Sequence, residues 1–134
     1  MKKNRLLALL RNLDAREFKR LEEMVYSPFF NKDRKVTLLF ELLKPFAPAF
    51  DSPQLTKQWL FEQLFDGRKK ITSSLSIKMS KLQTLVKEYL TLNRLEERPY
   101  YKRHLLLDAL LEKEQFDFFQ SQYREDYKSS GKTA

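Results

Sequence analysis

Apolar residues recur along most of this chain at the spacing of an amphipathic helix, and this pattern predicts a series of helices. Phe18, Leu21 and Val25 stand at i, i+3 and i+7, so they share one face of a helix. The same spacing recurs within residues 36–43 and 75–89. We therefore predict an all-α fold: a compact bundle of about six or seven helices that ends in a helical hairpin.

Capping residues and prolines predict where the first helices begin and end. Asp14 and Glu17 have the D-x-x-E form of a capping box, which is typical of a helix N-terminus. Pro28 ends that helix, because the residue before a proline is pushed out of the α region. Either Asn31 or Asp33 is suited to cap the helix that follows.

The second half of the chain contains the longest predicted helix and the hairpin. A long apolar stripe predicts one helix over residues 72–95. Pro99 fits the first turn of the next helix, over residues 99–113, and a further helix follows it. Residues 99–128 form the predicted hairpin. Residues 129–134 hold no core-forming side chain, so we predict a flexible tail there.

Length and composition are those of one folded helical domain, which we place at residues 1–128. The 134 residues are 42% hydrophobic and 33% charged, and two glycines with five prolines leave little turn chemistry for a many-stranded sheet. No stretch approaches the roughly 18 apolar residues of a membrane span, so we expect no membrane partner. The chain lacks cysteine, which is compatible with a reducing compartment, and we expect a cytoplasmic protein.

The amino-acid composition excludes most kinds of catalytic, metal-binding and phosphate-binding site. Thiol sites, zinc clusters and glycine-rich phosphate cradles need residues that a chain with one histidine, no cysteine and two glycines does not have in number. His104 has one acidic neighbour a turn further on, Asp108, and such a pair is common on helix surfaces. We therefore expect no catalytic residue, no metal, no cofactor and no small-molecule substrate, and the protein is not expected to be an enzyme.

A basic segment makes nucleic acid a candidate partner. The formal net charge is +8, and residues 67–87 hold six basic residues and no acidic one. The segment joins a short helix to a long one across a glycine-containing turn, which is the outline of a helix-turn-helix over residues 56–95. The candidate phosphate contacts are Arg68, Lys69, Lys70, Lys81 and Lys87. A solvated helix face beside a basic loop accounts for the same residues and is the favoured interpretation.

Two groups of aromatic residues are candidates for binding a protein. Phe29 and Phe30 follow Pro28; adjacent aromatics can anchor a partner, but in a short connection they usually complete the core, as we expect here. Phe119, Tyr123 and Tyr127 continue a stripe at helical spacing near the chain's end, which suits packing against another helix.

The stripe of Phe119, Tyr123 and Tyr127 leads to the functional prediction. We expect a non-catalytic interaction module, the N-terminal part of a longer protein, that binds another protein or its own C-terminal region. A DNA-binding regulator that uses residues 56–95 is the alternative.

Two resemblances to known families add to this interpretation. Residues 75–82 (LSIKMSKL), preceded by 60–65 (LFEQLF), resemble the recognition region of winged-helix activators, in which a tetratricopeptide-like helical module follows. That resemblance implies DNA binding. Residues 27–32, 52–56 and 60–65 are similar to the N-terminal region of a family of uncharacterised bacterial all-helical proteins. This second resemblance implies a bacterial source and a longer native chain, and it carries no activity.

Overall fold

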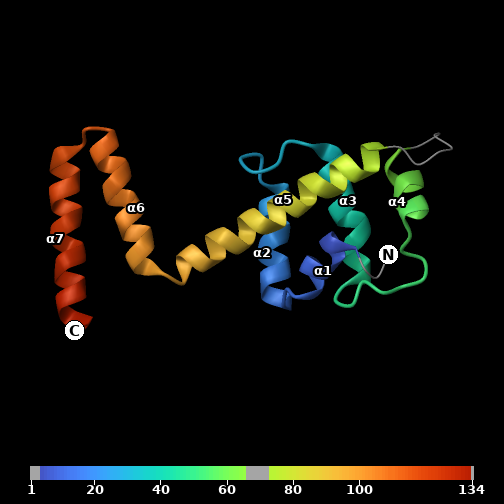
Figure 1. The fold of residues 1–134 in the computed structure, drawn as a ribbon, viewed down its shortest axis with the longest axis horizontal. Helices are drawn as coiled ribbons and strands as arrows, with labels where there is room; N and C mark the ends of the chain where they lie inside the picture. Colours follow the sequence, from blue (N-terminus) through green and yellow to red (C-terminus); the bar gives the residue numbers. More distant parts are fainter. Residues whose placement is uncertain (1–3, 66–72, 134) are drawn as a thin grey trace. The chain divides into compact units, whose positions relative to one another are not determined.

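The computed structural model describes residues 4–65 and 73–133, with side chains up to residue 128. The predicted all-α class is confirmed, since these residues form helices and loops and contain no strand (Figure 1). The elements, in chain order, are α1 (Arg5–Arg11), α2 (Ala15–Tyr26), α3 (Arg34–Leu43), the 3₁₀ helix η1 (Lys44–Phe46), α4 (Lys57–Leu64), α5 (Ser73–Glu96), α6 (Pro99–Glu112) and α7 (Phe116–Thr133). Within the described residues, no helix is both long and apolar enough to cross a membrane.

The chain divides into two compact units, residues 1–90 and 91–134. The division falls inside α5, six residues before that helix ends at Glu96. The sequence predicts a single domain over residues 1–128. The helix-turn-helix-like segment predicted over residues 56–95 extends across the division.

Side-chain caps fix the helix ends of the first unit. The predicted capping box is confirmed: the Asp14 carboxylate accepts a hydrogen bond from the Glu17 amide at 2.8 Å, and the Glu17 carboxylate accepts one from the Asp14 amide at 3.0 Å. Of the two candidate caps for α3, Asp33 is the one used, because its carboxylate accepts from the Lys35 amide. Asn31 instead supports this cap, since its side-chain oxygen accepts from the Asp33 amide.

The hydrophobic core of the described residues lies in the first unit. Helix α3 packs between α2 and α4 (Figure 1), and the apolar stripe of α5 adds Leu75, Leu82 and Val86 to the buried set. The largest fully buried side chains are Phe40, Phe50 and Phe61. The core therefore follows the helical stripes that the sequence predicts.

The loop between η1 and α4 is held by an arginine of α1. The Arg11 Nε donates to the Ala49 carbonyl at 2.8 Å, and its Nη2 donates to the Phe50 carbonyl at 3.3 Å. Phe50 has a φ of 50°, in the left-handed region that disfavours a side chain of this size. Its ring is nonetheless 1% exposed and lies 6.1 Å from the Phe18 ring, so burial and the arginine contacts together stabilise this conformation.

One expectation from the sequence is corrected by the structure. Phe29 is 87% exposed and Phe30 37%, so they do not complete the core between α2 and α3. The turn is instead closed by Asn31, whose amide donates to the Val25 carbonyl at 2.9 Å and to the Thr37 hydroxyl at 3.0 Å. Helix α7 continues to Thr133, within residues 129–134 where the sequence predicts a flexible tail, and the flexibility of that segment stays a prediction. An established helix extends at little cost per residue, even through poor helix formers.

Candidate functional site

The second unit contains an antiparallel pair of helices joined by a tight turn, as the sequence predicts (Figure 1). The Gln115 amide donates to the Leu110 carbonyl at 2.8 Å, and the Glu114 amide donates to the Leu111 carbonyl at 3.0 Å. Together these bonds make a Schellman motif, which ends α6 and reverses the chain. Glu114 occupies the left-handed position of this motif with a φ of 59°, where glycine is the usual residue.

None of the hydrophobic side chains described in the hairpin is buried, and the last residue of the buried core is Tyr89. The contact between α6 and α7 only half-buries the side chains along it. On α6 and α7 the half-buried residues are Arg103, Leu107, Leu110, Phe119, Gln122 and Asp126. The other side chains of α6 and of α7 up to residue 128 are exposed, so the described part of the hairpin has a seam but no core.

A row of aromatic and apolar residues runs along one side of each helix of the hairpin, and we call these residues the aromatic face. Its members recur at i, i+4, i+7 and i+11 on α6 and at i, i+3, i+7 and i+11 on α7, so each set follows one side of its helix. They are Tyr100, His104, Leu107, Leu111, Phe116, Phe119, Tyr123 and Tyr127. None of these positions carries a formal charge when His104 is neutral.

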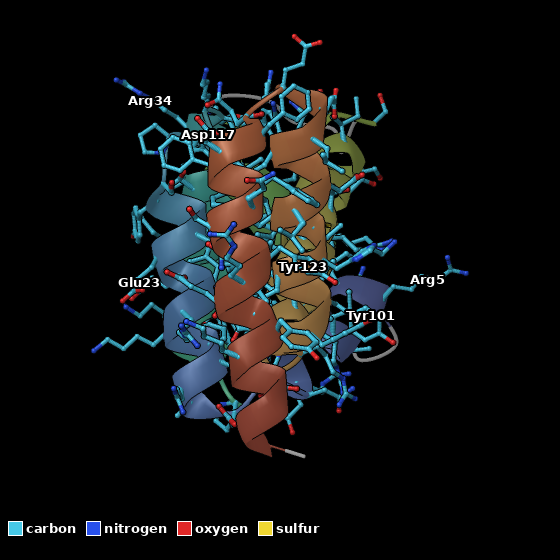
Figure 2. The ribbon with its side chains drawn as sticks, turned by 90° about the vertical axis from the view of Figure 1, so that its left-hand side faces the viewer. Arg5, Glu23, Arg34, Tyr101, Asp117 and Tyr123 are labelled. Carbon is cyan, nitrogen blue, oxygen red and sulfur yellow. The ribbon has the colours of Figure 1, made fainter. Side chains whose placement is uncertain are left out.

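A pocket of about 210 Å³ shows that the two rows lie on the same side of the hairpin. Its lining residues come from both helices: Tyr100, Arg103, His104, Leu107, Tyr123, Asp126 and Tyr127. In Figure 2, Tyr123 extends from α7 toward α6, whereas Tyr101 extends away from the pair on the outer side of α6. Tyr123 is 54% exposed and Tyr127 72%.

A carboxylate stands at the edge of the aromatic face. The Asp126 Oδ1 accepts a hydrogen bond from the Gln122 side chain at 3.0 Å. Its Oδ2 is shielded from solvent and has no hydrogen-bond partner among the described residues. The Phe119 ring stacks on Tyr123 with centroids 6.2 Å apart, which orients the tyrosine over the pocket.

The predicted protein-binding residues are therefore brought together, and the structure adds residues that the sequence reasoning missed. Phe119, Tyr123 and Tyr127 share one side of α7, as their spacing predicts. Tyr100 and His104 of α6 complete that side. The spacing from Tyr100 to Leu111 was the available signal, but leucines on every side of α6 hide it, because no single apolar stripe stands out.

Of the five candidate nucleic-acid contacts, Arg68, Lys69 and Lys70 lie outside the described residues. Lys81 is engaged within the protein: its Nζ lies 3.0 Å from Asp33 Oδ2. Lys87 is exposed on the same helix. Six positions separate the two lysines, so they leave α5 in directions about 120° apart.

Asp33 joins α3 to α5 through two lysines. Lys78 Nζ lies 2.7 Å from the Asp33 carboxylate, and Lys81 shares the same oxygen. Burial raises the pKa of the Asp33 carboxyl, but hydrogen bonds from Lys78, Lys81 and the Lys35 amide outweigh this effect and lower the pKa to about 2. The lysine side chains at this place therefore hold the fold together, which is a structural use of positive charge.

Comparisons with other proteins add no family to this picture. No protein-family model, no curated protein and no solved structure matches the chain. The two resemblances noted in the sequence therefore stay predictions. Across residues 4–65 and 73–133, no three histidine or acidic side chains are grouped so that they could hold a metal ion.

Proposed function

We propose that this protein is a non-catalytic interaction module that binds another protein through the α6–α7 hairpin. The observation that carries the proposal is the aromatic face: eight residues without formal charge along two helices, flanked by Arg103 and Asp126, whose hydrophobic members are not buried. Exposed apolar patches of this kind are typical of protein–protein contacts, because covering them removes apolar surface from water. The remainder of a longer native chain belongs among the partners that this proposal admits.

The distribution of leucine on α6 supports the same proposal. Leu105, Leu106 and Leu111 are 54%, 43% and 45% exposed. Their positions point in three directions, each about 100° or more from the next. A helix that is apolar on all sides is typical of a core, with neighbours on more than one side. Helix α7 covers only one side of α6, so the pair is suited to pack against further helices.

Charge separates the hairpin from the rest of the chain. Residues 1–90 hold 18 basic and 10 acidic groups, whereas residues 91–134 hold eight of each. The whole excess of +8 thus belongs to the first unit. A neutral, apolar hairpin favours a protein surface over a polyanion as its partner. The absence of cysteine fits a reducing compartment, and we propose that the module acts in the cytoplasm.

Site-specific photo-cross-linking tests the proposal. A photoreactive phenylalanine analogue replaces Tyr123 in the full chain inside the source cells. The control places it at Phe118, which is 67% exposed on the same helix but about 140° away around the helix axis. We expect a discrete cross-linked protein band from position 123 and none of that size from position 118. The absence of any cross-link at 123, or the same bands from both positions, would contradict the proposal.

The DNA-binding alternative receives no support from the described residues. Lys81 is paired with Asp33, and Lys81 and Lys87 leave α5 in different directions. Fluorescence anisotropy with duplex DNA across a salt series tests it, beside a variant in which the five candidate basic residues become glutamine. Tight binding at physiological salt that disappears in the variant would revive this alternative.

A further inference from the structure

We propose that the aromatic face is covered by the aromatic face of a second copy of this chain, so that two hairpins form an antiparallel four-helix bundle about a two-fold axis. This inference rests on the proposed function and names the partner. Two-helix hairpins that lack a core of their own can acquire one by pairing face to face, as four-helix bundles do. Two features of the hairpin support a second copy as the occupant, and a third sets the expected strength of the pairing.

The first feature is shape. We call residues 98–105 and 122–128 the open end of the hairpin, and residues 106–121 the turn end. The pocket of about 210 Å³ lies at the open end, between Tyr100 and Tyr127. At the turn end the same face presents Leu111 and Phe116, which are 45% and 58% exposed. One end of the face is thus hollow and the other carries exposed apolar side chains.

A two-fold axis across the face makes these two ends complementary. In an isologous pair the same patch meets itself, with the turn end of one copy over the open end of the other. Phe116 of each copy then meets the pocket of its partner. The fit occurs twice, once on each side of the axis, and needs no other protein.

The second feature is charge. The turn end carries four acidic residues and one basic residue, whereas the open end carries five basic and two acidic residues. The acidic residues of the turn end are Asp108, Glu112, Glu114 and Asp117, and the basic residues of the open end are Arg98, Lys102, Arg103, Arg124 and Lys128. Lys102 is paired with Glu96 at 2.7 Å, which leaves the open end positive.

This polarity selects the antiparallel arrangement. Opposite charges meet when the turn end of one hairpin lies over the open end of another, and like charges meet when the hairpins run parallel. The second unit as a whole is neutral, so pairing brings no net repulsion between hairpins. An unrelated partner would need to match both the pocket and the charge pattern, whereas a second copy supplies both.

The third feature is size, which sets the expected strength. Helix α6 has 14 residues and is therefore about 21 Å long, and two adjacent helices are about 20 Å wide, giving a footprint of about 400 Å². An interface of this size belongs to weak, reversible complexes. We therefore expect a dimer that forms in the micromolar range and dissociates on dilution.

Sedimentation velocity of the full chain tests the inference. Over concentrations from about 1 to 500 μM, chosen around the micromolar affinity expected of a small interface, the mass should rise from 16.2 kDa toward twice that value. Phe116→Ser should weaken dimerisation at least tenfold. Phe118→Ser is the matched control, because Phe118 is 67% exposed on the same helix but lies off the aromatic face. It should leave the dimer unchanged.

Charge reversal tests whether the charged ends of the hairpin take part in the pairing. One variant carries Asp108→Lys, Glu112→Lys and Asp117→Lys, which makes both ends of the hairpin positive. A second variant carries Arg98→Glu, Arg124→Glu and Lys128→Glu, which makes both ends negative. Each variant alone should be monomeric, and an equimolar mixture should form a heterodimer.

The outcomes separate this inference from the proposed function. A chain that stays monomeric throughout, while position 123 cross-links to a different protein, overturns the second copy as partner and leaves the interaction module standing. The absence of any cross-link at position 123 overturns both. A dimer that neither Phe116→Ser nor charge reversal weakens also overturns the inference, because that dimer would use another surface.

Discussion

Most leucine and phenylalanine side chains described in the first unit are packed away from water, whereas none of those described in the second unit is buried. In residues 1–90, Phe40 and Phe61 are fully buried between helices that run in several directions. In residues 91–128, Leu105 and Phe118 are more than half exposed. The helices of the two units obey the same periodicity. The difference is the number of neighbours, since α6 and α7 have only each other within their unit.

Charge follows the same division. The first unit holds the excess of positive charge, and part of it is used internally, where Lys78 and Lys81 meet Asp33. The second unit is neutral overall but has an acidic turn end and a basic open end. A complete core with a charged surface is typical of a unit that folds by itself. An uncovered apolar face with opposite charges at its ends is typical of a unit that associates.

The largest expected loss of stability comes from a substitution in the core of the first unit. Phe40→Ala removes a buried ring that stacks on Phe18 with centroids 5.2 Å apart, and it should lower the free energy of unfolding by about 3–5 kcal/mol. Phe118→Ala, at an exposed position of the hairpin, should change it by less than about 0.5 kcal/mol. Urea denaturation of the two variants measures the difference. Equal losses would contradict the contrast between the units.

A second, smaller effect concerns the loop after η1. Arg11→Met keeps the length of the side chain but removes the donors to the Ala49 and Phe50 carbonyls. We expect a loss of about 1–3 kcal/mol, because two backbone acceptors lose their partners. Arg16→Met, on the exposed side of α2, is the control and should be nearly neutral. Thermal unfolding monitored by circular dichroism distinguishes them.

The third prediction uses pH. Asp33→Asn retains a side-chain cap for α3 but removes the charge that meets Lys78, and it should cost about 1–2 kcal/mol at neutral pH. The pKa of the Asp33 carboxyl is about 2 in the folded protein, below its unfolded value of about 3.9. The stabilisation is therefore complete above pH 4 or so and is lost as the pH falls from about 4 toward about 2.

The free energy of unfolding of both chains, measured across this pH range, checks the direction of this pH dependence. The difference between the wild-type chain and Asp33→Asn should shrink as the solution becomes more acidic. A difference that stays constant down to about pH 2 would show that the carboxylate charge is not its source.

The smallest expected effect is a gain in the stability of the hairpin. Glu114→Gly places glycine at the left-handed position of the Schellman motif, where Glu114 has a φ of 59°. We expect the hairpin to gain about 0.5–1 kcal/mol, since glycine adopts this conformation without steric cost. Amide hydrogen exchange in α6 and α7 should slow, while exchange in α1–α4 stays the same. Faster exchange in the hairpin would contradict this assignment of the turn.

The helices can be predicted well from the sequence, because the caps and apolar stripes that determine them are local. Asp14 caps α2 where the D-x-x-E pattern predicts it, and the stripe along α5 is buried as its spacing predicts. Phe29 and Phe30 show the limit of such reasoning. Their exposure depends on how Asn31 closes the turn against Val25, a contact that residue preferences alone do not contain.

The candidate site, like the fold, could be predicted from the sequence only in part. The stripe through Phe119, Tyr123 and Tyr127 is local to one helix and was predictable. The contribution of Tyr100 depends on which side of α6 meets α7, and leucines around that helix leave several choices. The pairing of Lys81 with Asp33 joins residues 48 positions apart, so it depends on the tertiary fold.

Amide hydrogen exchange of the full chain at two protein concentrations tests the central claim most directly. The account predicts strong protection of α2, α3 and the first part of α5 at every concentration, because their core is complete. It predicts weak protection of α6 and α7 in dilute solution and clear slowing at high concentration, when a second copy covers the aromatic face. Exchange in α6 and α7 that is as slow as in α3 at the lowest concentration would contradict it, since the hairpin would then be stable without a partner.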